Sequence, residues 1–485
     1  MLEDIIGERL KKREALLAAG KNPYPAKVPR ISGIDRVIKY FTICALLRKN
    51  VSVAGRIMGK RAQGGVMFLD IQDASGKIQA VASKKKLSDF SLYKDNLDIG
   101  DFISATGRPF TTKKGEKSIE VSDLRIATKS LRPLPTTWYG FRDEEEKLRK
   151  RYLDILFNPE VKDMVEKRSK FWNSIRKFLM DRDFLEVETP VLETMPGGAD
   201  ARPFATHHNA LDMDVFLRIS MGELWQKKLM VAGFEKTFEI GRQFRNEGMD
   251  AEHLQDYTQM EFYWAYADYE MGMELVENLF KTTAKETFGT MKFKIGEFNV
   301  NLGKKWERYD YRSTVLKYTG VDILKTDLKE IEAKLKDLKI HYDKKGFNIT
   351  RAIDNLWKYC RRQIGGPGFL TGVPVEVSPL AKKDEKNPQL TQRFQVIIAG
   401  SELGNGYSEL NDPVDQEERF NAQMKLREEG DEEAQRKDED FLEALQYGMP
   451  PTCGFGMSER VFSFLINKTA RESQIFPLMK PKNEK

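Results

Sequence analysis

The sequence predicts an α+β fold with a small β-barrel first and then a larger domain of mixed strands and helices. Three observations predict this class. Short glycine-bounded strand runs fill positions 51–128, helical periodicity dominates around 151–178 and 268–288, and further apolar strand runs lie around and after these helices. At 485 residues, the chain is long enough for two or three domains with substantial cores.

The composition is that of a soluble globular protein, with 32% charged and 40% hydrophobic residues. Lys and Arg number 80 and Asp and Glu 74, a net charge of +6, so any nucleic-acid site must be a local patch. The spacing of Cys44, Cys360 and Cys453 fits a reducing compartment and argues against a structural zinc site. No apolar run approaches the ~18 residues of a membrane helix. We therefore expect a cytoplasmic protein with no membrane partner.

Residues 1–44 are predicted to form a helical extension. From 5 to 19, the residues Ile6, Leu10, Leu16 and Leu17 recur at a helical period, and Gly20 ends the helix. A basic face opposite them carries Arg9, Lys11, Lys12 and Arg13. This face is either ordinary solvated surface or a contact with nucleic acid, and charge alone does not separate the two.

Five strand runs between positions 45 and 128 predict a small all-β barrel. Helical residues after the third run indicate an OB-fold. Such barrels bind single-stranded nucleic acid by stacking bases on aromatic side chains, and Phe68 is the candidate here. A lone Phe on a barrel strand is more commonly part of the core, so both interpretations stay open.

The larger domain is expected at 151–485, after a proline-containing, charged linker at 129–150. It opens with a long helix through Phe178, which leads to a strand that ends at Pro190. A lysine-rich helical segment at about 320–356 is expected to be an insertion with a structural or RNA-facing role.

A hairpin at 238–263 carries the residues that best suit phosphate chemistry. Its two strands enclose a polar loop with Arg245, Glu247 and His253. Arginine suits a phosphate because its planar fork donates two parallel charge-assisted hydrogen bonds. A solvated hairpin in a highly charged protein is the alternative, and charge alone does not exclude it.

A strand run near the C-terminus carries Glu402, Asn405, Tyr407 and Glu409. The last three alternate, so they project from one face of a strand. Carboxylates that line a pocket suit a cationic substrate, whereas on an exposed strand they would be surface decoration. Glycines on both sides of Asn405 favour the pocket.

Three stretches resemble the motifs of the class II aminoacyl-tRNA synthetases. The helix and strand that end at Pro190 resemble motif 1, the stretch FRNEG with the returning strand MEFY resembles motif 2, and CGFGMSER before an apolar helix resembles motif 3. The runs PGGA and THHNALD are similar to the lysyl enzymes within that class. The resemblance implies a catalytic domain built on an antiparallel sheet flanked by helices. It also implies ATP and Mg²⁺, the partners L-lysine and tRNA(Lys), and a homodimer formed through motif 1.

The resemblance also implies roles for single residues, with Arg245 and Arg460 as the catalytic pair. The ATP-binding residues would be Arg245, Glu247, His253, Tyr257, Glu402 and Arg460. The lysine-binding residues would be Gly198, Glu223, Arg245, Glu261, Tyr263, Asn405, Tyr407 and Glu409. The anticodon-reading residues would be Phe68, Gln79 and Asp123. Glu402 would bind the metal, and Gln395 stands where the family has its second acidic ligand.

Some positions depart from the family pattern. Gln395 lacks the usual carboxylate, which predicts weaker metal binding or fewer ions; Glu252 replaces a common arginine; motif 3 is one residue short; and one extra residue precedes Glu223. These departures keep open a weakened synthetase paralogue that acts as a tRNA-binding or regulatory module. Two further alternatives are an aspartyl or asparaginyl enzyme, which Glu261 and Glu409 disfavour, and a ligase that modifies a protein lysine, which the barrel disfavours.

Overall fold

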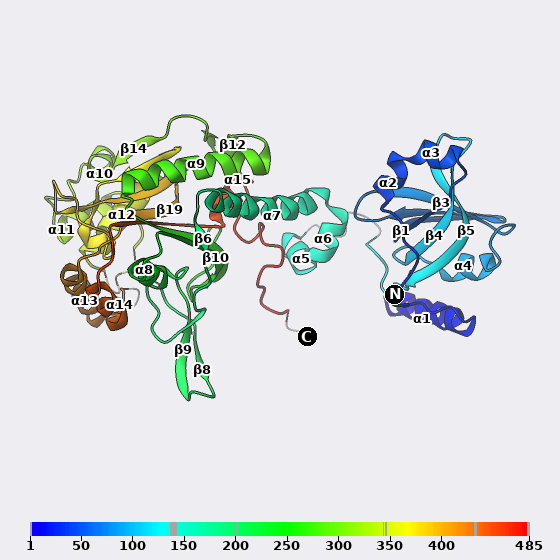
Figure 1. Ribbon diagram of the computed structural model, residues 1–485, viewed down its shortest axis with the longest axis horizontal. Helices are drawn as coiled ribbons and strands as arrows, with labels where there is room; N and C mark the ends of the chain where they lie inside the picture. Colours follow the sequence, from blue (N-terminus) through cyan, green and yellow to red (C-terminus); the bar gives the residue numbers. More distant parts are fainter. Residues whose placement is uncertain are drawn as a thin grey trace. The chain divides into compact units, whose positions relative to one another are not determined.

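The structure is a computed structural model that describes residues 2–135, 143–199, 201–342, 344, 347–430 and 434–482. It divides into two units, Met1–Arg142 and Asp143–Lys485 (Figure 1). Of the predicted linker, positions 136–142 lie outside the described residues. No helix in the described part of the chain is long and apolar enough to cross a membrane.

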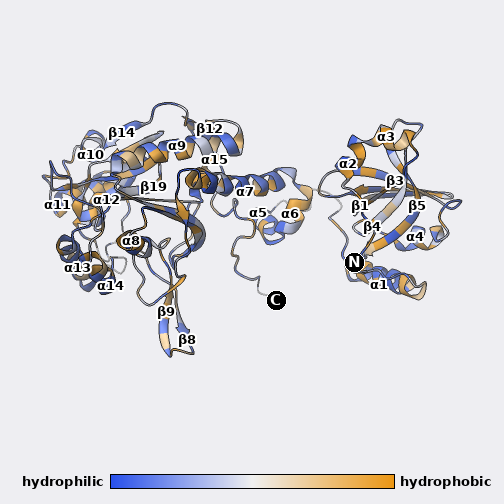
Figure 2. Ribbon diagram, in the orientation of Figure 1, coloured by the Kyte–Doolittle hydropathy of each residue, from blue (hydrophilic) through white to orange (hydrophobic). Residues whose placement is uncertain are grey.

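The five strand runs of the first unit form a closed barrel with the order β1-β2-β3-β5-β4. Burial alternates along the whole of β2, where Met67, Leu69 and Ile71 are fully buried while Phe68 is only half-buried. Phe68 is therefore not part of the barrel core. Figure 2 shows hydrophobic and hydrophilic residues mixed along these strands, as this alternation requires. The elements are β1 (Val51–Gln63), β2 (Val66–Gln72), β3 (Lys77–Ser83), α4 (Phe90–Asn96), β4 (Phe102–Thr111) and β5 (Lys117–Thr128).

Three helices precede the barrel: α1 (Leu2–Ala18), α2 (Ile34–Lys39) and α3 (Phe41–Leu46). The predicted faces of α1 are partly wrong. Leu16 is buried in the barrel core as expected, but Leu10 and Leu17 are exposed. Arg9, assigned to the basic face, is buried, and its guanidinium donates to the carbonyls of Ser130 and Ile99, each at 3.0 Å. These backbone acceptors satisfy a buried charge, which helical periodicity cannot reveal.

The second unit is built on an eight-stranded sheet with the order β14-β15-β18-β19-β20-β11-β10-β6. The pairs β14–β15 and β10–β6, at its two edges, are parallel, and the pairs between them are antiparallel. The predicted antiparallel sheet is therefore confirmed. Its strands are β6 (Leu185–Glu186), β10 (Lys236–Phe244), β11 (Asp256–Ala265), β14 (Glu307–Asp310), β15 (Gly368–Thr371), β18 (Arg393–Ile398), β19 (Ser401–Ser408) and β20 (Thr452–Ser458).

Helices α7 (Pro159–Met180) and α9 (Tyr269–Phe288) share a hydrophobic core with this sheet (Figure 1). The predicted first helix is two helices, because α6 (Arg151–Phe157) ends before Asn158, whose side chain caps α7 by accepting from the Glu160 N–H at 3.1 Å. Pro159 then occupies the first turn of α7, where its missing N–H costs nothing. A second cluster joins Tyr263 and Ala265 of the sheet to helices α8 (Glu223–Val231), α13 (Pro413–Glu428) and α14 (Glu439–Gln446).

The predicted insertion contains α11 (Leu328–Asp337) and most of α12 (Ile349–Arg361), with α10 (Tyr311–Thr319) before them. These helices pack around Val315, Leu335 and Trp357 in a cluster that also includes Leu370 and Ile397 of the sheet. Positions 343, 345 and 346 lie outside the described residues. The remaining elements of the second unit are α5 (Glu144–Arg149), β7 (Leu192–Glu193), β8 (Ala205–His208), β9 (Met213–Leu217), β12 (Lys292–Ile295), β13 (Phe298–Asn301), β16 (Val373–Pro374), η2 (Val375–Val377), β17 (Leu390–Thr391) and α15 (Arg460–Leu465).

Candidate active site

The predicted phosphate hairpin consists of β10 and β11, paired from Lys236–Trp264 to Phe244–Asp256. Arg245 follows β10 directly; its Nε donates to the Ile219 carbonyl at 3.3 Å, and its guanidinium carbon lies 6.0 Å from the centre of the Tyr257 ring. Strand pairing thus fixes the backbone on both sides of the polar loop. Because Arg245 contacts Ile219 and Tyr257, its side chain is not simply dissolved in solvent, as the alternative would require.

A cavity of about 380 Å³ opens over β11, β18, β19 and β20 and holds most of the predicted site residues. The lining includes Gly198, Glu223, Arg245, His253, Tyr257, Glu261, Tyr263, Gln395, Glu402, Asn405, Tyr407, Glu409 and Arg460. Glu247 is the predicted substrate residue that does not line it. Its Oε1 accepts from the Arg202 N–H at 3.3 Å, and its carbonyl accepts from Gln255 at 2.9 Å.

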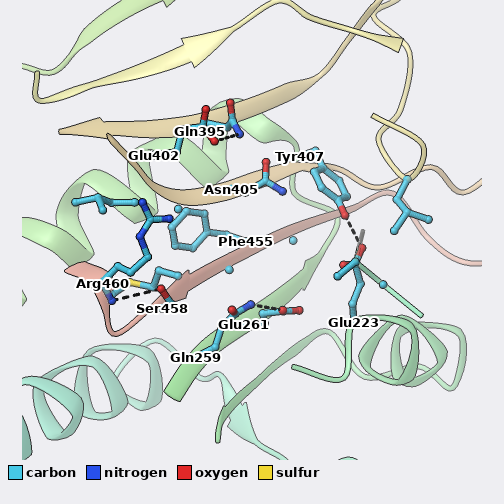
Figure 3. Close-up of a pocket in the computed structure, with 18 of the residues that line it drawn as sticks. Glu223, Gln259, Glu261, Gln395, Glu402, Asn405, Tyr407, Phe455, Ser458 and Arg460 are labelled. Carbon is cyan, nitrogen blue, oxygen red and sulfur yellow. Dashed lines mark hydrogen bonds between the residues drawn. The ribbon is translucent and has the colours of Figure 1, made fainter. Parts of the chain in front are cut away.

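A bulge in β19 brings Glu402 to the cavity. The pairing of β18 with β19 shifts between Val396 and Ile397, which inserts one extra residue near Leu403. Glu402 and Asn405 are three positions apart, so an unbroken strand would place them on opposite faces, yet both line the cavity (Figure 3). Asn405 is held there by Arg393, whose Nε donates to its Oδ1 at 2.8 Å.

Three buried carboxylates gather at one end of the cavity, those of Glu223, Glu261 and Glu409. Glu261 accepts from the Met221 N–H at 3.0 Å, from the Tyr263 hydroxyl at 3.0 Å and from the Gln259 amide at 2.6 Å. Figure 3 shows the Gln259 contact and the hydrogen bond that the Tyr407 hydroxyl donates to Glu223. We call this set the acidic end.

The glycines of β20 make room for these carboxylates. A Cβ at position 454 would lie 2.1 Å from Oε1 of Glu409, and one at position 456 would lie 3.0 Å from Cγ of Glu261. Only glycine therefore permits this strand to run beside both acids.

Burial dominates the protonation of the acidic end. It raises the pKa of Glu261 to about 7, and the nearby charge of Glu223 adds to the effect. Burial likewise raises the pKa of Glu409, although Lys227 opposes the shift. The hydroxyl pKa of Tyr263 and that of Tyr407 lie well above their ordinary values for the same reason. Both tyrosines therefore act as hydrogen-bond donors at neutral pH.

The other end of the cavity contains Glu402 and Gln395, joined by a hydrogen bond of 3.1 Å from Nε2 of Gln395 (Figure 3). Oε1 of Glu402 accepts from the Trp357 indole N–H at 2.6 Å and lies 3.6 Å from Nε of Arg361. Among the residues that the structure describes, no group of three or more His, Cys, Asp or Glu is arranged to hold a metal. Glu402 and Gln395 therefore offer one carboxylate and one amide oxygen, which are few ligands for an ion such as Mg²⁺ that prefers oxygen.

Arg460 begins α15 despite the short motif 3 and reaches the same region. One guanidinium nitrogen donates to the Ser401 hydroxyl at 2.7 Å and pairs with Glu252 from the motif 2 loop. Burial opposes ionisation of Glu252, but Arg460 and Ser401 outweigh it and hold its pKa below the ordinary value. We call Glu402, Gln395, Glu252 and Arg460 the phosphate end.

Sequence reasoning missed three residues at the site: Lys227, Trp357 and Arg361. Lys227 is one helical turn after Glu223, a spacing that signals an ion pair on a predicted helix. Trp357 and Arg361 belong to α12, which contacts the site only through the tertiary fold, so that no local pattern singled them out.

The predicted anticodon residues lie on the barrel. Phe68 (β2) and Gln79 (β3) project from the same outer face, as the pairing of Phe68 with Val81 shows, and Arg61 lies 6.0 Å from the Phe68 ring centre. Gln79 is buried and accepts from the Ser118 hydroxyl at 3.2 Å. Asp123 (β5) accepts from Nε of Arg125 at 2.9 Å.

Comparison with known proteins matches both units. Residues 143–480 match the family of class II tRNA synthetases (D, K and N), and residues 51–127 match the OB-fold nucleic acid binding domain. A lysine–tRNA ligase of Clostridium tetani is 44% identical, covering 98% of this chain and 96% of its own length. One of Roseiflexus sp. is 42% identical over 99% of this chain and all of its own length. One of Christiangramia forsetii is 42% identical over 98% of this chain and 86% of its own length. The alternative of a regulatory module finds no support among these relatives. With both domains matched over nearly their whole length, the chain belongs to the class II aminoacyl-tRNA synthetases, in the family of the lysine–tRNA ligases.

Proposed function

We propose that this protein attaches L-lysine to tRNA(Lys) through a lysyl-adenylate intermediate. The observation that carries the proposal is the acidic end, where three buried carboxylates face a cavity that also holds Arg245 and Arg460. A buried ammonium is stable only when it is paired, so carboxylates at one end select a cationic side chain. An aspartate or asparagine side chain would meet repulsion or leave these acids unpaired.

Adenylate formation needs an in-line attack of the lysine carboxylate on the α-phosphate of ATP, with pyrophosphate as the leaving group. Such a displacement depends on positioning and on stabilisation of developing charge. We assign Arg245 to bridge the lysine carboxylate and the α-phosphate. Tyr257 and Arg460 enclose adenine, with Glu247 recognising its edge, and His253 contacts the outer phosphates.

The lysine side chain extends to the acidic end. Glu261, Tyr263 and Glu409 hold the ε-ammonium there, and Glu223 holds the α-ammonium. Gly198, Asn405 and Tyr407 shape the walls between the two groups. In the second step, a terminal ribose hydroxyl of tRNA attacks the adenylate carbonyl, and AMP leaves.

Mg²⁺ fits the phosphate end incompletely. Glu402 would hold the ion, and Gln395 would offer an amide oxygen only after its NH₂ group turns away from Glu402. The ion would neutralise charge on the ATP phosphates when bound. Because one ligand position carries no charge, we propose weaker ion binding than a pair of carboxylates would give.

The barrel supports a role in tRNA recognition, since Phe68 is half-buried on an outer face beside Arg61. We assign Phe68 to stack on an anticodon base, and Gln79 and Asp123 to read base edges. We further propose a homodimer formed through the motif 1 helix and strand. A cytoplasmic location agrees with the three free cysteines.

Lysine-dependent exchange between ATP and pyrophosphate tests the proposed reaction. We expect exchange with lysine and none with aspartate or asparagine, and an Arg245→Ala variant should lose it by about 10²-fold or more. A folded protein that exchanges with no amino acid in the presence of Mg²⁺ would overturn the proposal. Exchange with aspartate instead of lysine would refute the assignment of the acidic end.

A further inference from the structure

Lys227 is enclosed behind the acidic end. It lies on α8, one turn after Glu223, and its side chain is 1% exposed. Its Nζ is 2.8 Å from Oε1 of Glu223 and 2.6 Å from Oε2 of Glu409. The chain therefore places its own ammonium between two of the acids that face the lysine pocket.

This ammonium is charged in the folded protein. Burial disfavours the charge, but the carboxylates of Glu223 and Glu409 outweigh burial and raise the pKa of Lys227. The rings of Tyr407 and Phe441, with centres 5.5 and 5.8 Å from Nζ, enclose it on the remaining sides. Such a shielded ion pair keeps both acids in fixed positions, because neither can turn away without leaving an unpaired charge.

The charges of the pocket then match those of its ligand. Three carboxylates and one ammonium leave a net charge of −2 when all are ionised. Free lysine carries two ammonium groups, and its carboxylate is assigned to Arg245. Without Lys227, the pocket would present three negative charges to two positive ones.

We propose that Lys227 is a positioning and charge-setting residue for amino-acid recognition, which orients Glu223 and Glu409 and reduces the pocket charge to the number of ammonium groups on lysine. The inference rests on the proposed lysine specificity. It assigns Lys227 no contact with the substrate, since the residue does not line the cavity.

The test compares the KM for lysine in ATP–pyrophosphate exchange between pH 6 and 8.5, for the full-length protein and a Lys227→Met variant. The titratable groups that act on the Lys227 ammonium are Glu223 and Glu409. Around these two acids lie Glu261, Tyr263, Tyr407 and Cys453, and Arg393 acts on Tyr407. Lys227 opposes the rise in the pKa of Glu409, so loss of the ammonium should raise that pKa further, and the acids should ionise only at a higher pH than in the parent. We expect the KM for lysine at pH 7 to rise roughly tenfold and the pH at which KM falls to move upward by about one unit. The KM for ATP should change less than about twofold.

Two controls separate this role from a purely structural one. Lys228→Met removes the neighbouring lysine of the same helix, whose ammonium pairs with Asp440 away from the cavity, and should leave the pH profile unchanged. A Lys227→Met/Glu409→Gln variant restores the net charge of −2. Its KM should remain high, because a ligand is lost, but the pH midpoint should return to that of the parent.

An unshifted pH midpoint in Lys227→Met, with only the melting temperature lowered, would overturn the inference. If Lys227→Met does not fold, the double variant Lys227→Met/Glu409→Gln provides the test. A pH midpoint of its KM for lysine that differs from the parent's would refute charge matching. Lysine-dependent exchange by the parent is established first. Its absence would refute the proposed function and, with it, the inference that rests on lysine specificity, whereas exchange with an unshifted midpoint would refute the inference alone.

Discussion

The two ends of the active-site cavity are built differently. At the acidic end, Glu223, Glu261 and Glu409 are almost wholly buried. Glu261 accepts three hydrogen bonds, Glu223 contacts Lys227 and Tyr407, and Glu409 pairs with Lys227. At the phosphate end, Glu252 is partly exposed, and Gln395 stands at the second ligand position. Burial strengthens the electrostatic interactions at the acidic end, whereas solvent screens those of Glu252 at the phosphate end, so we expect substitutions to have larger effects at the acidic end.

Removal of one carboxylate from the acidic end should give the largest effect. Glu261 has no cationic side chain among its polar contacts, so it is the acid most available to the ε-ammonium. We expect Glu261→Gln to reduce kcat/KM for lysine by about 10²- to 10³-fold, since an unpaired buried charge costs about 3–5 kcal/mol. Steady-state exchange kinetics with lysine and with ATP will measure the effect.

The same variant has a predicted pH signature. Because burial raises the pKa of Glu261 to about 7, the free protein holds this acid partly protonated at neutral pH. Lysine requires the ionised form, so the KM for lysine should fall as pH rises through 7 and increase below it. This dependence should be weaker in Glu261→Gln. An equal pH dependence in both proteins would show that another group controls binding.

A carboxylate introduced at position 395 of the phosphate end should strengthen Mg²⁺ binding there. Gln395→Glu places a second negative oxygen beside Glu402, and Mg²⁺ prefers such hard, charged ligands. We expect the Mg²⁺ concentration for half-maximal exchange to fall by about three- to tenfold. Repulsion between the two acids should also lower the melting temperature when Mg²⁺ is absent. Tight Mg²⁺ dependence in the parent that the variant leaves unaltered would contradict this prediction.

The smallest effect is expected at Glu252. Its pairing with Arg460 must be loosened or shared when Arg460 stacks on the adenine of ATP, so Glu252→Gln should lower the KM for ATP by about two- to fivefold. The KM for lysine serves as the internal control and should stay constant. A rise in the KM for ATP would instead mean that Glu252 holds Arg460 in its productive orientation.

Much of this architecture was predictable because local chemistry and tertiary structure agree. Period-two patterns predicted the barrel strands and the β10–β11 hairpin. They also predicted that Asn405, Tyr407 and Glu409 share one face. Glu402 lines the same cavity because of a bulge in β19. Strict alternation would place Glu402 on the opposite face from Asn405, and no distinctive residue marks the bulge in the sequence. The prediction that Arg9 lies on an exposed basic face was wrong because its partners are backbone carbonyls from distant loops. Trp357 and Arg361 could not be predicted locally because their contacts with Glu402 join residues more than 40 positions apart in the sequence.

The hydrogen bond from Trp357 to Glu402 links the packing of helix α12 to the temperature dependence of the site. Trp357 belongs to the cluster that packs α10, α11 and α12 together, which also includes Leu370 and Ile397 of the sheet. Units of this kind can open at a lower free energy than the whole molecule. Each opening would withdraw the indole N–H from Glu402 while the sheet stays intact. We therefore expect the KM for ATP to rise on warming at temperatures where the protein is still folded.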